Sequence, residues 1–73
     1  MDGPLDLKGL KCPLPALLAK RALLAAPRGI EVAIVTDDPL AVLDVPHMCR
    51  DESFELVSLE RDGDVARMVL RRP

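Results

Sequence analysis

Cys12 is the residue of this chain best placed for covalent chemistry. It directly precedes Pro13 in the stretch GLKCPLPALLAKR, residues 9–21. Proline is tolerated in the first helical turn, where backbone N–H groups have no partner within the helix. The stretch therefore predicts a helix that begins at Pro13, with Cys12 as its N-cap. The positive end of the helix dipole and the neighbouring Lys11 both favour a thiolate, so we expect an exposed Cys12 with a lowered pKa.

Pro15 removes a second N–H donor from the same turn. The turn is then rigid without forming a complete anion-binding nest. We interpret Lys11, Pro13 and Pro15 as the residues that present Cys12 at a fixed angle. The alternative interpretation is that Cys12 is a small buried hydrophobic residue, as free cysteines often are.

Other thiol and metal chemistries have weaker support. The residues that follow Cys12 supply no C-x-x-C partner, and a cysteine protease would depend on His47 as its base. Cys12, His47 and Cys49 lack the spacing of a zinc site, so we expect neither a metal nor a cofactor. We expect Cys49 to serve packing, although a redox pair with Cys12 stays open.

The length of 73 residues predicts a single domain over residues 1–73. Hydrophobic residues make up 49% of the chain and charged residues 30%, which is typical of globular proteins. We see no signal peptide in the first residues, MDGPLDLKG, and no apolar run long enough to span a bilayer. The expected location is the cytoplasm, away from membranes.

Charge is distributed unevenly around a net value of −2. Residues 1–30 carry five basic and two acidic side chains, whereas residues 31–73 carry five basic and ten acidic side chains. This asymmetry has two interpretations. Either the charges simply form an ordinary solvated surface, or the more basic end of the molecule around Cys12 faces an acidic protein partner. The acidic net charge and the single aromatic residue, Phe54, argue against direct binding of nucleic acid.

The pattern of elements predicts an α+β fold. A short strand should end at Gly9, the first helix should span residues 13–26, and residues 31–36 should form a buried strand. Asp38-Pro39 reads as the start of a second helix that stops or kinks near Val45, before Pro46. Residues 54–60 and 65–71 alternate as strands around an Asp62-Gly63 turn. The order βαβαββ predicts a two-layer sandwich with both helices on one face of a four-stranded mixed sheet.

The first helix has one narrow face of small residues. At 100° per residue its core side holds Ala16, Ala19, Leu23 and Ala26, flanked by Leu18 and Ala22. A second set of side chains is then exposed or partly exposed. We interpret it as a surface for partner docking, against the alternative of ordinary surface leucines, and it comprises Leu14, Leu17, Lys20, Arg21 and Leu24.

These residues together resemble a known family. The stretches LDLKGLKCPLPALLAKRAL, TDDP, DVP with a nearby cysteine and FELVSLERDG are closely similar to the TusA/SirA-like family of small sulfur-carrier proteins. The resemblance covers about residues 5–72, and its signature is the CPxP motif from Cys12 to Pro15. Lys11 stands where many members have arginine, and Ser53-Phe54 stand where relatives often have a small residue and histidine, which leaves the choice of partner open.

The resemblance implies a βαβαββ sandwich in which Cys12 carries a sulfane sulfur as a persulfide, with no other cofactor. Its implied donors are a cysteine desulfurase or a rhodanese-type enzyme, and its implied acceptors serve tRNA thiolation, molybdenum cofactor assembly or sulfur oxidation. We expect a monomer. Two alternatives stay open: a non-catalytic interaction or regulatory module, and a thiol redox protein that uses Cys12 and Cys49.

Overall fold

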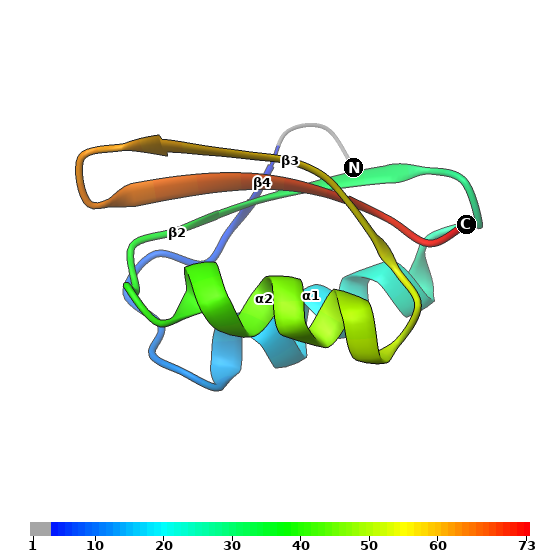
Figure 1. Cartoon of the computed structure of the whole chain (residues 1–73), viewed down its shortest axis with the longest axis horizontal. Helices are drawn as coiled ribbons and strands as arrows, with labels where there is room; N and C mark the ends of the chain where they lie inside the picture. The colour runs from blue at the N-terminus through cyan, green and yellow to red at the C-terminus, as the bar shows by residue number, and fades with distance from the viewer. Residues whose placement is uncertain (1–3) are drawn as a thin grey trace.

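The computed structural model describes residues 4–73, which fold into a four-stranded sheet with two helices on one of its faces (Figure 1). The elements follow in the order β1 (Leu5–Asp6), α1 (Leu14–Ala25), β2 (Glu31–Thr36), α2 (Ala41–Asp51), β3 (Glu55–Asp62) and β4 (Val65–Arg71). This is the predicted α+β sandwich. Strands β2 and β4 have the predicted bounds because their β-branched and alternating residues suit a half-buried pleated surface.

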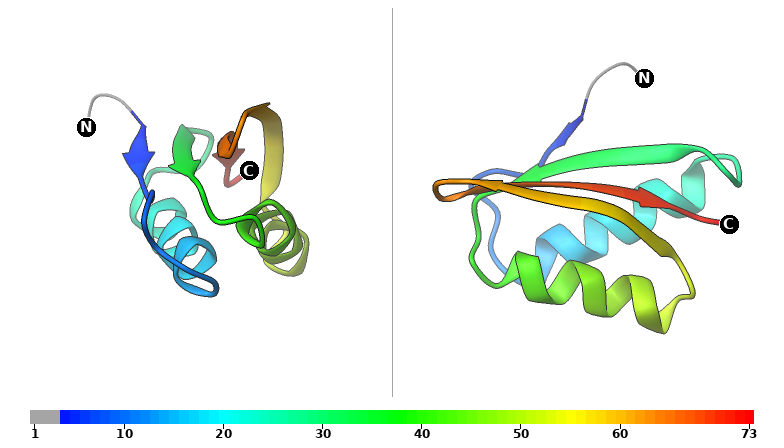
Figure 2. Two further views of the ribbon diagram at one scale, coloured as in Figure 1. Left: turned by 90° about the vertical axis from the view of Figure 1, so that its left-hand side faces the viewer. Right: turned by 45° about the horizontal axis from the view of Figure 1, so that its top comes forward.

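The strands lie in the order β1-β2-β4-β3. Strand β1 pairs parallel with β2, and β4 pairs antiparallel with both β2 and β3. The parallel pair requires a crossover, which α1 provides. Both helices therefore start at the same end of the sheet and run in the same direction (Figure 2).

The core lies between the helices and the inner face of the sheet. Leu23 of α1, Val45 of α2 and Ile34 of β2 are fully buried there. The predicted inner face of α1 is correct, since Ala16 and Ala19 are also buried. Aliphatic side chains thus fill most of the core, the partly buried Phe54 packs against it, and α1 contributes small buried side chains.

Both helices begin later than the sequence predicted. The N-cap of α1 is Pro13 rather than Cys12, and the N-cap of α2 is Leu40 rather than Asp38. The turn before α1 is closed by the N–H of Leu14, which donates to the carbonyl of Lys11 at 2.8 Å. That bond keeps the residues before Leu14 in a turn, so Cys12 lies just outside the helix.

The predicted break of the second helix near Val45 is wrong, because α2 continues through Pro46 to Asp51. A proline in the helix interior removes one backbone hydrogen bond and disfavours helix in the residue before it. Here Val45 is fully buried, as is Cys49 one turn later. Burial of this continuous apolar face outweighs the local penalty of the proline.

Candidate active site at Cys12

Cys12 lies in the loop between β1 and α1, and its free thiol is exposed. This loop is held to the sheet at its start, where the N–H of Leu7 donates to the carbonyl of Val35 at 2.8 Å. Gly9 then turns the chain with a φ of 86°, a left-handed conformation that favours glycine. The hydrogen bond at Leu7 and the turn at Gly9 therefore fix the backbone between the edge strand β1 and Cys12.

Two adjacent aspartates fix the loop from the other side. The N–H of Cys12 donates to Oδ2 of Asp38 at 2.7 Å, and the N–H of Gly9 donates to Oδ1 of Asp37 at 2.9 Å. Asp38 is buried, and its own N–H donates to the hydroxyl of Thr36 at 3.3 Å. The loop between β2 and α2 thus positions the backbone of Cys12, at the end of the sheet where both helices begin (Figure 1).

The sulfur of Cys12 has its own partner on α2. The thiol donates a hydrogen bond to Oδ2 of Asp44. Asp44 lies in the first turn of α2, where the helix dipole favours a carboxylate. The Cys12 sulfur therefore lies between the starts of two helices, with a carboxylate in direct contact.

These acids overturn the expected direction of the Cys12 pKa. The hydrogen bond to Asp44 raises the pKa of the Cys12 thiol, and partial removal from water and the negative charges of Asp44 and Asp38 act in the same direction. Cys12 also lies one residue outside the N-cap of α1, and the effect of a helix dipole falls off within the first turn. The resting side chain at neutral pH is a neutral thiol.

The three predicted presentation residues all lie at this turn. Lys11 and Pro13 are exposed, the Cys12–Pro13 peptide bond is cis, and Pro15 is buried near the start of α1. Lys11 and Pro13 are the exposed chain neighbours of Cys12, whereas Pro15 belongs to the packed side of the helix. Sequence reasoning missed the three aspartates, although they lie in the TDDP and DVP stretches, because their approach to Cys12 depends on the fold.

The predicted docking residues lie largely on the outer surface of α1. Leu14, Leu17 and Leu24 are 46%, 56% and 51% exposed, and Arg21 is exposed beside them. Lys20 instead turns toward α2, where its Nζ lies 3.1 Å from Oε2 of Glu52.

Two exposed leucines on the neighbouring helix were not predicted. Leu40 and Leu43 are 53% and 66% exposed at the start of α2, in the turn that leads to Asp44. An apolar surface therefore flanks the Cys12 end from both helices. The sequence contains an indication of this surface, since Leu40 and Leu43 both lie within the first residues of the predicted second helix, just before the DVP stretch.

The other two reactive side chains do not meet Cys12. Cys49 is a free cysteine that is 1% exposed, and burial raises its pKa. His47 is exposed, and its Nε2 lies 3.3 Å from Oδ2 of Asp51 one turn along α2. Within residues 4–73 there is no group of three or more His, Cys, Asp or Glu side chains that could hold a metal ion.

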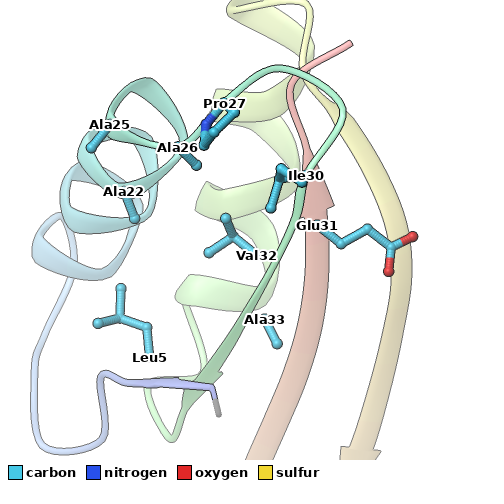
Figure 3. Close-up of a pocket in the computed structure, with 9 residues that line it drawn as sticks. All are labelled: Leu5, Ala22, Ala25, Ala26, Pro27, Ile30, Glu31, Val32 and Ala33. Atoms are coloured by element: carbon cyan, nitrogen blue, oxygen red, sulfur yellow. The ribbon is translucent and has the colours of Figure 1, made fainter. Parts of the chain in front are cut away.

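A cavity of about 420 Å³ lies apart from this site, between the C-terminal half of α1 and the edge of the sheet (Figure 3). Its lining is mainly apolar and includes Leu5, Ala22, Ile30 and Val32. Neither Cys12 nor its aspartates line it. In the same described part of the chain, every helix is too short or too polar to cross a membrane.

Comparison with known proteins identifies similar chains. Residues 4–72 match the family model described as sulfurtransferase TusA. The crystal structure of a SirA-like protein from Desulfitobacterium hafniense superposes with a TM-score of 0.79 at 25% sequence identity. That similarity covers 93% of this chain and 93% of the other, so the two proteins share the fold over nearly their whole lengths.

Proposed function

The chain belongs to the TusA family of sulfurtransferases, and we propose that Cys12 is its sulfur-carrying residue. The observation that carries the proposal is the exposed free thiol of Cys12 on a loop anchored by Asp38. Cys49, the other cysteine, is buried and has no access to a partner. Cys12 accepts a sulfane sulfur as a persulfide and passes it to an acceptor protein.

Sulfur transfer of this kind needs an exposed thiol that a partner protein can reach, and it needs no bound cofactor. The Cys12 sulfur attacks the outer sulfur of a donor persulfide, and the donor thiolate leaves. Because a carrier depends on its partners, we expect little turnover by the chain alone. A free working thiol also suits a reducing compartment, and we propose the cytoplasm.

The partners that we propose are those of the family. A cysteine desulfurase or a rhodanese-type enzyme supplies the sulfur, and an acceptor in tRNA thiolation, molybdenum cofactor assembly or sulfur oxidation receives it. Nothing about this role requires direct contact with nucleic acid, and a monomer suits a carrier that enters several active sites.

The partner surface that we propose surrounds Cys12 on both helices. It consists of the predicted residues of α1 together with the leucines of α2, namely Leu14, Leu17, Lys20, Arg21, Leu24, Leu40 and Leu43. Exposed apolar side chains with a basic rim are typical of a surface that binds an acidic protein partner. Lys20 pairs with Glu52, whereas Arg21 has no ion pair among residues 4–73 and supplies the remaining positive charge of this rim.

The experiment is the intact mass of the protein after incubation with a cysteine desulfurase and cysteine, or with thiosulfate and a rhodanese. We expect the wild-type chain to gain the mass of one sulfur atom. Cys12→Ser should abolish the gain and Cys49→Ser should preserve it, with circular dichroism used to confirm that both variants fold. A gain that persists in Cys12→Ser, or its absence from the wild type, would contradict the proposal.

A further inference from the structure

We propose that Asp44 takes the proton of the Cys12 thiol during sulfur transfer and returns it to the leaving thiolate of the donor. The inference rests on the proposed function of Cys12 and names a second residue that acts in the same reaction. It follows from the contact between the thiol and Oδ2 of Asp44. A proton acceptor must lie within hydrogen-bond reach of the proton it removes, and Asp44 does.

Both partners of this hydrogen bond are held in place by the fold. Asp44 lies on α2 between two fully buried residues, Ala41 in the preceding turn and Val45 directly after it. The backbone N–H of Cys12 is fixed by Asp38. The thiol and the carboxylate therefore meet as parts of two anchored segments, which is the arrangement that efficient proton transfer needs.

The charges around the sulfur explain why a proton acceptor is needed. The Asp44 carboxylate contacts the sulfur from α2, and the Asp38 carboxylate holds the backbone N–H of Cys12 from the loop before α2. Lys11 is the basic neighbour within the loop itself. With two carboxylates against one exposed ammonium group, a free thiolate is disfavoured before a donor arrives. Removal of the proton must then accompany the attack on the donor.

The proposed step balances in atoms and charge. The S–H bond of Cys12 breaks as the proton passes to Asp44, and the sulfur forms a bond to the outer sulfur of the donor persulfide. The S–S bond of the donor breaks, and its electron pair stays on the inner sulfur. Asp44 then gives the proton to that sulfur. A thiol and a persulfide thus become a persulfide and a thiol, without an added oxidant or reductant.

Asp44→Asn tests this step because two reactions of the same sulfur should change in opposite directions. Alkylation of Cys12 by iodoacetamide at neutral pH should become several-fold faster, since loss of the carboxylate lowers the thiol pKa and the thiolate is the reacting species. Sulfur transfer from a cysteine desulfurase loaded with persulfide should become about a hundredfold slower, since general acid–base catalysis contributes about that factor.

The matched control is Asp51→Asn, the same change on the same helix at an exposed residue that pairs with His47. It should alter neither rate. Asp44→Glu keeps a carboxylate and should recover part of the transfer rate. In Asp44→Asn only the fraction of Cys12 that has already lost its proton to solvent can react, and this fraction grows with pH. The ratio of its transfer rate to that of the wild type should therefore rise with pH. Circular dichroism establishes that every variant is folded.

Three outcomes overturn the inference, and each is distinct. If the transfer rate of Asp44→Asn rises over the wild type by the same factor as its alkylation rate, Asp44 only restrains the thiol. A rate ratio that does not vary with pH would show a positioning role without proton transfer. A wild-type chain that gains no sulfur from any donor would overturn the proposed function itself, and this inference with it.

Discussion

The thiol of Cys12 donates its hydrogen bond to Asp44, a residue 32 positions later in the chain. Because β1 and β2 are parallel, the turn that leads into each helix lies at the same end of the sheet. The carboxylate therefore reaches the sulfur across two neighbouring βα turns. This relationship raises the pKa of the Cys12 thiol and holds against the sulfur the carboxylate that we propose as its proton acceptor.

Asp38→Ala should release the Cys12 loop. The substitution removes the acceptor of the Cys12 N–H and leaves that donor without its 2.7 Å partner. We expect a loss of about 1–3 kcal/mol in the free energy of unfolding, the usual effect of leaving a partly buried donor unpaired. Urea denaturation measures it, and faster hydrogen exchange at the Cys12 amide locates it. Asp37→Ala is the matched control, with a smaller effect because its bond to Gly9 is exposed.

Leu23→Ala and Leu24→Ala should differ sharply although the residues are adjacent on α1. Leu23 is fully buried and Leu24 is 51% exposed. Truncation of a buried leucine costs about 2–5 kcal/mol, whereas an exposed one changes stability by about 0.5 kcal/mol or less. Thermal and urea denaturation of the two variants test this. Equal losses would show that α1 packs with a different face inward.

Leu17→Asp and Leu43→Asp should weaken binding of the sulfur donor without unfolding the domain. Both leucines are more than half exposed near Cys12, at 56% and 66%. A carboxylate buried without a partner in an apolar interface costs about 2 kcal/mol or more of binding free energy, or about thirtyfold in affinity. Isothermal titration with a cysteine desulfurase measures it. Ile30→Asp is the control, since Ile30 is 51% exposed at the opposite end of β2; an equal effect there would refute the surface.

The two thiols should make the fold less stable at alkaline pH. Burial raises the pKa of Cys49, and the hydrogen bond to Asp44 raises that of Cys12, so the folded chain retains protons that the unfolded chain has lost. The stability from these thiols is complete below the ordinary pKa of the unfolded thiol and is lost as pH rises through the raised folded values. The melting temperature should therefore fall more steeply with pH in the wild type than in Cys12→Ser/Cys49→Ala, and parallel curves would contradict this.

Local patterns determined most of the secondary structure. The β-branched run of β2 and the alternation of β4 predicted both strands with correct bounds, because these preferences depend on neighbours in the chain. The spacing of Ala16, Ala19 and Leu23 likewise predicted the buried face of α1. At Pro46 the local rule failed, since burial of Val45 and Cys49 against the sheet stabilises the helix beyond what the proline removes.

Cys12 could be singled out as the candidate sulfur carrier from the sequence, but its electrostatic surroundings came from the tertiary structure. The sequence showed Cys12 beside Lys11 and a helix start, and these local features favour a thiolate. The fold adds carboxylates from 26 and 32 residues away, Asp38 and Asp44, and they raise the thiol pKa instead. Charge interactions depend on distance in space rather than along the chain, so only the parallel βα arrangement could decide them.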